Sequence, residues 1–230
     1  MFTGIVAAHC EVVSIDRKPG LHTIAVRLPI ELCPGIEQGA SIAIDGVCLT
    51  VTRLEADIAL FDVMQETIRV TTLADLEPGM RVNVERSMRG GAEVGGHLVS
   101  GHVDGLATIV RLERPENNWT IVFSVPPGWM KYIFPKGFIA LNGVSLTVGF
   151  VDRAAAQFAV YLIPETLKRT TFGLKGVGDR VNFEVERQTQ AIVDTMNMFL
   201  ERLEEKLLAT GGSVPAGLLD EMVPGLVRRG

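Results

Sequence analysis

The sequence contains an internal repeat, and this repeat constrains the fold more than any other feature. The segment Asp45–Val51 (DGVCLTV) recurs as Asn142–Val148 (NGVSLTV). Further matches follow in unchanged order, at an offset of 97 positions up to this motif and of 99 positions beyond it, as for Glu66 and Glu165. A two-residue difference in one loop accounts for the change of offset. Matches in the same order over most of each copy indicate a duplicated domain.

Each copy carries the signals of β-strands. Short runs rich in Val, Ile and Thr alternate with Gly, Pro, Asp and Asn at intervals of roughly 8 to 12 residues. The dipeptides Asp45-Gly46 and Asn142-Gly143 are favoured in tight hairpins because they tolerate positive φ. We therefore expect a mainly β protein with two tandem six-stranded closed β-barrels, related by internal duplication, plus a C-terminal α-helix. A short helical turn is expected at Glu66–Arg69 and again at Glu165–Lys168.

These patterns set the expected domain boundaries. The first barrel is expected to span residues 1–94 and the second residues 95–187. The glycine-containing, polar segment Ser87–Ala92 is the expected linker. Residues 188–209 predict an amphipathic helix. Residues 210–230 show little periodicity and are expected to form a flexible tail.

The expected helix over 188–209 carries a narrow apolar stripe. Ile192, Met196, Phe199 and Leu203 recur at spacings of four, three and four residues. Such a stripe can pack on the chain's own barrels or against copies of itself in an oligomer. The sequence leaves both alternatives open.

Composition and charge disfavour several classes of function. The formal net charge is −5 and only 6% of residues are aromatic, which argues against nucleic acid as a partner. No stretch reaches the roughly 18 apolar residues of a membrane span, and the opening residues lack the pattern of a secretion signal. Three cysteines without C-x-x-C spacing fit a reducing, cytoplasmic compartment. No metal-ligand spacing, phosphate loop or dinucleotide fingerprint is present, so neither a metal nor a cofactor is expected.

Small polar groups lie beside the repeated glycine turn. Because side chains alternate along a strand, Cys48 and Thr50 face away from their apolar neighbours, and Ser145 and Thr147 do the same in the second copy. Such a face suits a flat heterocycle that is hydrogen-bonded at its rim. Half-exposed strands of no special function give the same pattern.

The two copies differ at positions close to the shared motifs. The aligned pairs are Phe2 with Val99, Ile5 with His102, Ser41 with Phe138, Cys48 with Ser145, Asp62 with Tyr161 and Gln65 with Pro164. These differences are expected if two related pockets hold similar ligands in different roles, and drift after duplication is the alternative. His102 lies in a glycine-flanked stretch, and histidine suits proton transfer near neutral pH.

With these motifs the chain resembles the riboflavin synthase family over about residues 1–200. The motifs that carry the resemblance are Met1–Val6, Gly46–Val51, Gly96–His102, Met130–Ile133, Lys136–Phe138, Gly143–Val148 and Ile163–Leu167. The resemblance implies a transferase of riboflavin biosynthesis that dismutates two molecules of 6,7-dimethyl-8-ribityllumazine. A four-carbon unit passes between them, giving riboflavin and 5-amino-6-(D-ribitylamino)uracil. It also implies a homotrimer whose active sites lie between barrels of neighbouring subunits, and lumazine synthase as a further partner.

The resemblance also assigns site residues by motif. A catalytic role falls to His102, Cys48, Ser41 and Phe2. The N-terminal pocket is expected to use Gly4, Ile5, Val6, Ser41, Cys48, Leu49, Thr50, Asp62, Val63, Met64, Gln65, Glu66 and Thr67. The C-terminal pocket is expected to use Gly101, His102, Val103, Lys136, Ser145, Leu146, Thr147, Leu162, Ile163, Pro164, Glu165, Thr166 and Leu167. Glu186 stands where some family members carry Asp, so the carboxylate is kept with a longer reach.

The main alternative is a lumazine- or flavin-binding protein of the same fold without catalysis, such as the optical antenna proteins of luminous bacteria. Those proteins keep one good pocket and lose features of the other, whereas both copies here keep the G-V-[CS]-L-T-V motif. A flavin-binding barrel of an electron-transfer reductase would need a nicotinamide domain, for which the chain is too short. The sequence therefore favours the enzyme.

Overall fold

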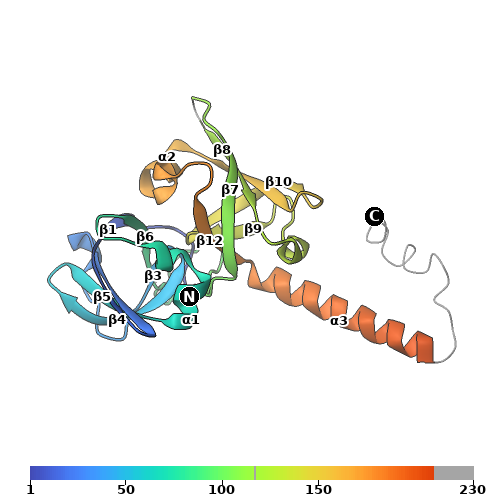
Figure 1. The fold of residues 1–230 in the computed structure, drawn as a ribbon, viewed down its shortest axis with the longest axis horizontal. Coiled ribbons are helices and arrows are strands. Elements are labelled where there is room, and N and C mark those ends of the chain that lie inside the picture. The colour runs from blue at the N-terminus through green and yellow to red at the C-terminus, as the bar shows by residue number, and fades with distance from the viewer. Residues whose placement is uncertain (117, 210–230) are drawn as a thin grey trace. The chain divides into compact units, whose positions relative to one another are not determined.

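Two closed β-barrels make up most of the computed structural model, which describes residues 1–116 and 118–209 (Figure 1). Residues Met1–Arg187 form one compact unit that holds both barrels. The expected tail over 210–230 lies outside the described residues. The expected fold class, two six-stranded barrels and a C-terminal helix, is confirmed.

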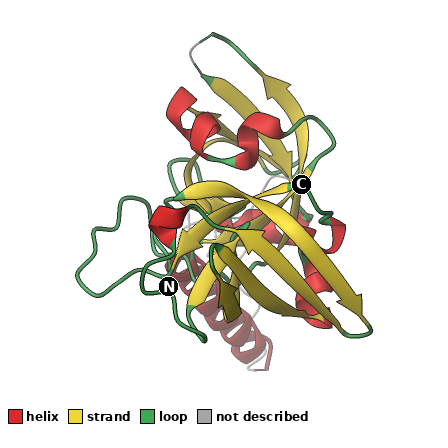
Figure 2. Ribbon diagram, turned by 90° about the vertical axis from the view of Figure 1, so that its left-hand side faces the viewer, coloured by secondary structure: helices red, strands yellow, loops and turns green. Residues whose placement is uncertain are grey.

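The two barrels have the same topology, with all neighbouring strands antiparallel. Figure 2 shows the strands connected by loops and short helices. In the first, the order around the barrel is β1-β2-β5-β4-β3-β6, and in the second it is β7-β8-β11-β10-β9-β12. The strands of the first barrel are β1 (Ala8–Lys18), β2 (Leu21–Arg27), β3 (Ser41–Ile44), β4 (Val47–Glu55), β5 (Ile58–Met64) and β6 (Arg81–Arg86). Those of the second are β7 (Gly105–Glu113), β8 (Trp119–Ser124), β9 (Phe138–Leu141), β10 (Val144–Asp152), β11 (Gln157–Leu162) and β12 (Arg180–Val185).

Short helices join the strands. The expected helical turns are present as α1 (Gln65–Val70) and α2 (Pro164–Arg169). The 3-10 helices are η1 (Ile30–Leu32), η2 (Thr72–Asp75), η3 (Pro127–Tyr132) and η4 (Thr171–Leu174).

The loops explain the repeat pattern. Asp45-Gly46 and Asn142-Gly143 close the β3-β4 and β9-β10 hairpins with φ of 44° and 81°, and of 45° and 77°, the positive values that a two-residue turn of this kind requires. The loop from β4 to β5 has two residues between the strands, whereas residues 153–156 separate β10 from β11. This hairpin therefore contains the two-residue difference that shifts the repeat offset.

Alternating side chains fill the barrel interiors. In β4, Val47, Leu49 and Val51 are buried while Cys48 and Thr50 are not, as the alternation predicts. The second barrel is rich in phenylalanine, with the buried rings of Phe123 and Phe158 stacked at 5.7 Å between centroids.

A symmetric hydrogen-bond network joins the barrels. The Asn83 side chain donates to the backbone oxygen of Asn142 (2.9 Å), and Asn182 donates to that of Asp45 (2.8 Å). Their side-chain oxygens accept from the backbone N–H groups of Thr171 and Thr72, both at 2.8 Å. All of these residues are buried. Because each bond has its counterpart in the other repeat, the two barrels face each other across an approximate twofold axis.

Helix α3 (Arg187–Ala209) forms a separate part of the chain. Its stripe residues Ile192, Met196 and Phe199 are 64%, 48% and 56% exposed. Among the described residues, no helix combines the length and apolar character needed to cross a membrane.

Candidate functional site

The opening segments of the two repeats are exchanged between the barrels. Gly4 packs on the second barrel, where its carbonyl accepts from the Ser145 N–H at 2.8 Å. Gly101 packs on the first barrel, where its carbonyl accepts from the Cys48 N–H at 2.9 Å. Both glycines have positive φ, and a Cβ on either would lie 2.5–2.6 Å from the Cβ of its partner. Only glycine permits this approach.

This exchange corrects the expected grouping of the site residues. Gly4, Ile5 and Val6 were expected in the N-terminal pocket, but they line a cavity with Ser145 of the second barrel. Gly101 was expected in the C-terminal pocket, but it contacts Cys48 of the first. An antiparallel bridge between Phe2 and Val99 joins the two segments at their crossing. Hereafter the candidate site around Cys48 is called the first-barrel pocket, and the cavity at Ser145 is called the second-barrel pocket.

Buried carboxylates hold the exchanged segments. Glu85 on β6 accepts from the backbone and hydroxyl of Thr3, both at 2.7 Å, and from the Gly4 N–H at 3.1 Å. Glu184 on β12 accepts from the backbone and hydroxyl of Ser100, both at 2.8 Å, and from the Gly101 N–H at 2.9 Å. Burial raises the pKa of Glu85, while these donors act in the opposite direction. Sequence reasoning missed both residues, although Glu85 and Glu184 occupy equivalent repeat positions.

The second-barrel pocket is a cavity of about 320 Å³. Its lining is Gly4, Ile5, Val6, Val144, Ser145, Glu165, Thr166, Arg169 and Thr170. Arg169 is ion-paired with Glu165 and lowers the pKa of that carboxyl. The pocket therefore combines an apolar side chain, Ile5, with hydroxyl and charged groups from α2.

The first-barrel pocket brings Cys48 together with the segment that carries His102. The His102 N–H donates to the Ser100 hydroxyl (3.2 Å), and the equivalent Ile5 N–H donates to Thr3 in the same way (3.2 Å). Arg187 donates to the His102 carbonyl and pairs with Asp104 at 2.9 Å, which fixes the segment from its far side. Both His102 and Ile5 are exposed. The imidazole and the alkyl chain thus take equivalent places at the two pockets.

Several predicted residues can offer a ligand only their backbone. Leu49, Val63, Leu146 and Leu162 are buried, with their side chains in the barrel cores, whereas the strand residues beside them face outward. The outward residues are Thr50, Asp62 and Met64 on the first barrel and Thr147 and Ile163 on the second. Gln65, Glu66, Pro164 and Lys136 are exposed, and Thr67 and Leu167 are half-buried. Val103 packs against the first barrel's core.

The outer faces differ between the barrels. Asp62 accepts from the Thr23 hydroxyl at 2.7 Å. Tyr161, which aligns with Asp62, instead lays its ring over Gly149, where a Cβ would lie 2.4 Å from Cε2. A flat aromatic surface therefore replaces a carboxylate, as two pockets with different roles would require.

Phe2 is buried beneath the candidate site. Its side chain is fully buried in a cluster with Ala43, Val99 and Ala140, beneath the half-buried Cys48. From this place Phe2 packs under Cys48, so a contribution to the reaction through the position of Cys48 stays a prediction. Ser41 lies opposite Thr50 in the β3-β4 register and is half-buried.

His97 is a site residue that the sequence reasoning missed. Its Nδ1 lies 2.6 Å from the Ser145 hydroxyl, and its ring stacks on Phe138 with centroids 5.2 Å apart. Burial lowers the pKa of His97, while the charge of Glu186 acts in the opposite direction. Its place in the motif Gly96–His102, which carries part of the family resemblance, could have indicated that His97 belongs to the site.

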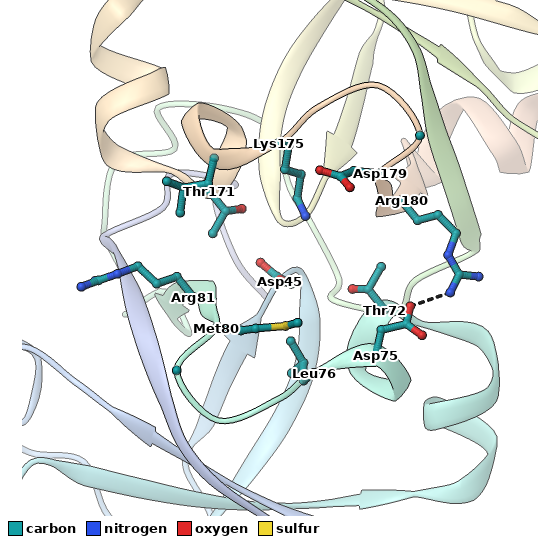
Figure 3. A pocket seen from close by; sticks show the side chains of 13 residues that line it. Asp45, Thr72, Asp75, Leu76, Met80, Arg81, Thr171, Lys175, Asp179 and Arg180 are labelled. Atoms are coloured by element: carbon teal, nitrogen blue, oxygen red, sulfur yellow. Dashed lines mark hydrogen bonds and ion pairs between the residues drawn. The ribbon is translucent and has the colours of Figure 1, made fainter.

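A further cavity lies between the barrels, away from Cys48 and Ser145. It measures about 640 Å³ and is lined by residues of both repeats, among them Asp45, Thr72, Thr171 and Lys175 (Figure 3). The hydroxyls of Thr72 and Thr171 are buried and have no hydrogen-bond partner among the residues that the structure describes. Burial raises the pKa of Asp45 to about 6. None of these residues was predicted to be functional.

Comparison with known proteins identifies the family. The Lumazine binding domain family matches residues 3–87 and 100–186, one match for each barrel. Riboflavin synthase of Escherichia coli (strain K12) is 48% identical over 212 residues, which cover 92% of this chain and 99% of that protein. The chain belongs to the riboflavin synthase family. The riboflavin synthase of Chlamydia trachomatis serovar D is 41% identical over 201 residues, or 86% of this chain and 96% of that protein.

A solved structure extends the comparison. LumP complexed with riboflavin superposes with a TM-score of 0.76 at 25% identity, covering 81% of this chain and 100% of LumP. The riboflavin synthase family and LumP therefore share the two-barrel fold. The resemblance inferred from the sequence motifs is confirmed.

Proposed function

We propose that this protein is a riboflavin synthase. It would convert two molecules of 6,7-dimethyl-8-ribityllumazine into riboflavin and 5-amino-6-(D-ribitylamino)uracil by transfer of a four-carbon unit. The observation that carries the proposal is the pair of equivalent strand positions, Cys48 and Ser145, each packed against an exchanged glycine but with different neighbours, in a chain that is 48% identical to a riboflavin synthase over 212 residues. Two identical substrates leave as different products, so the reaction requires two sites that treat the same ring differently.

The substrate supplies most of the reactivity. The C7 methyl group of the lumazine is acidic because its anion delocalises into the ring. The protein then has to hold two rings face to face, exchange protons with them and exclude water. The exposed His102 imidazole, with Cys48 and Ser41 on the same barrel, provides the titratable and polar groups of the first-barrel pocket.

One assay tests this proposal. Purified protein treated with a chelator is mixed with 6,7-dimethyl-8-ribityllumazine, and the reaction is followed by absorbance and fluorescence. We expect two lumazines to be consumed for each riboflavin formed, with no additive. Lumazine that binds tightly but is not consumed would instead identify an antenna-type binding protein. A strict requirement for an added metal or nicotinamide would contradict the proposed mechanism.

A homotrimer belongs to the same proposal. It is supported by the exposed stripe of Ile192, Met196 and Phe199 on α3, because three such helices can bury their stripes together. Truncation after Gln188 should then reduce the oligomer size measured by light scattering. An unchanged oligomer would mean that the stripe serves only packing within the chain.

We also propose a cytoplasmic location and an association with lumazine synthase. The location is supported by Cys10, Cys33 and Cys48, which are all free thiols. The association is testable by co-sedimentation of the two purified proteins.

A further inference from the structure

Ser145 and Cys48 occupy equivalent strand positions but have different neighbours. Each backbone N–H donates to the carbonyl of an exchanged glycine, at 2.8 and 2.9 Å. The side chain of Cys48 packs on the apolar cluster of Phe2, Ala43, Val99 and Ala140. The Ser145 hydroxyl instead forms a 2.6 Å hydrogen bond with Nδ1 of His97.

The position of the His97 ring is fixed from three sides. The side chain is buried, with 7% of the residue exposed, and its ring lies nearly parallel to Phe138, at an interplanar angle of 14°. The preceding Gly96 packs so closely that a Cβ would lie 2.4 Å from the Thr3 carbonyl oxygen and 2.6 Å from the Ser145 Cβ. The backbone before His97 is therefore packed against the exchanged segment, and Phe138 covers one face of the ring.

A hydroxyl bound in this way has a restricted orientation. Serine offers one donor and two lone pairs, and its proton normally rotates to suit any partner. If Nδ1 accepts the hydroxyl proton, only lone pairs remain for a ligand, and if Nδ1–H donates to the hydroxyl, the hydroxyl proton stays available to the ligand. In either tautomer the bond holds the Ser145 side chain in place. Burial favours the neutral form of His97, because it lowers the pKa of the ring.

We propose that His97 is a positioning residue that holds the Ser145 hydroxyl in one rotamer toward the ring bound in the second-barrel pocket. The inference rests on the proposed function, whose active site requires two pockets that treat identical rings differently. The Cys48 thiol, a weak hydrogen-bonding group on an apolar cluster, leaves the first-barrel pocket without this directed contact. The His97–Ser145 pair thus acts on one of the two lumazines and not on the other.

Two substitutions separate the hydrogen bond from the stacking. His97→Phe keeps an aromatic ring against Phe138 and removes the bond to Ser145. His97→Asn removes the ring, but its amide can reach the place of Nδ1 and keep the bond. We expect His97→Phe to lower kcat about 10- to 100-fold, as loss of a directed hydrogen bond does, and His97→Asn to restore most of that loss. KM for the lumazine and the melting temperature should change little.

A double-mutant cycle supplies the decisive measurement. His97→Phe combined with Ser145→Ala should be no slower than Ser145→Ala alone. When His97→Phe is combined with Cys48→Ala, the effects of the two substitutions on kcat should multiply, because Cys48 lies in the other pocket. Multiplying effects with Ser145→Ala, or an equally poor His97→Asn, would overturn the inference. If His97→Phe does not fold, the comparison of His97→Asn with His97→Ala answers the same question.

A measurement without turnover keeps the inference separate from the proposed function. The ¹⁵N NMR signal of His97 Nδ1 in the ligand-free protein should shift in Ser145→Ala and stay unchanged in Cys48→Ala. Wild-type protein without riboflavin formation would contradict the proposed function but leave this comparison intact. An Nδ1 signal that does not respond to Ser145→Ala would contradict the positioning role.

Discussion

The carboxyl group of Asp45 occupies in the first repeat the place that the amide of Asn142 occupies in the second. Asp45 Oδ1 accepts from the Asn83 N–H at 2.8 Å, and Asn142 Oδ1 accepts from the Asn182 N–H at 2.7 Å. The network between the barrels is thus symmetric except for one ionisable group. Because Asp45 is buried, a negative charge on its carboxyl group lowers the stability of the fold, whereas the neutral amide of Asn142 carries no such charge.

Asp45 should therefore make the stability of the protein depend on pH. Its pKa is about 6 when folded, against about 3.9 for an unfolded aspartate, so the folded state binds the proton more tightly. The free energy of unfolding should fall by about 2 kcal/mol as pH rises from about 4 to about 6. Asp45→Asn should flatten this slope in urea unfolding measured from pH 4 to 8. An unchanged slope would show that other groups cause it. The gain at pH 8 should be partial, because the new amide, like that of Asn142, would have an unpartnered Nδ2.

Glu85 and Glu184 should each act on the pocket of the opposite barrel. Glu85→Gln removes half of an acceptor pair that holds Thr3 and Gly4, so the exchanged segment at Ser145 should loosen. We expect hydrogen–deuterium exchange at the Gly4 amide to become about tenfold faster while the Gly101 amide is unaffected. Glu184→Gln should show the reverse pattern, and each variant is the control for the other. Equal changes at both glycines would indicate general destabilisation.

Gly46 should tolerate no side chain, because two turns meet there. A Cβ on Gly46 would lie 2.5 Å from the backbone nitrogen of Gly143, in addition to the strain of φ +81°. Gly79 has a similar φ of +89° but open space around it, so it is a matched control. We expect Gly79→Ala to cost about 1 kcal/mol and Gly46→Ala at least about 3 kcal/mol in urea unfolding. Equal costs would mean that the backbones can separate without penalty.

His102 should matter more to the chemical step than to binding. The His102 side chain is exposed at the first-barrel pocket, and Ile5 takes the equivalent place at the second-barrel pocket. His102 can therefore exchange protons with only one of the two bound rings. His102→Gln keeps hydrogen-bonding capacity but cannot titrate near neutrality. We expect turnover to fall about 10²- to 10⁴-fold with little change in lumazine affinity or melting temperature. A matched loss of affinity and melting temperature would make His102 structural.

The barrels, and the strand faces on which Cys48 and Thr50 lie, could be predicted from the sequence because the relevant signals are local. Strand alternation placed Cys48 and Thr50 on the outer face, and the repeated Asp-Gly and Asn-Gly turns gave the hairpins. The exchange of the opening segments could not be predicted in this way. The repeat alignment pairs Gly4 with Gly101 but contains no information about which barrel each one contacts.

The burial of Phe2 and the role of Glu85 follow from that exchange, so they were out of reach for the same reason. Phe2 is buried only because its segment crosses Val99 on the way to the other barrel. The Glu85 carboxylate is satisfied only because Thr3 and Gly4 cross over it. Both depend on contacts between residues more than 80 positions apart in the chain.

The crossed segments also bear on how a chain of this kind could arise. A lone repeat has to take the segment that completes its pocket from a neighbour. Two identical repeats can complete each other's pockets only by exchanging their opening segments. The Phe2–Val99 bridge lies where these two segments cross. The architecture is that of a domain-swapped homodimer whose two halves are joined by one linker. Because each half carries its own copy of the exchanged segment, the two copies can differ, as Ile5 and His102 do.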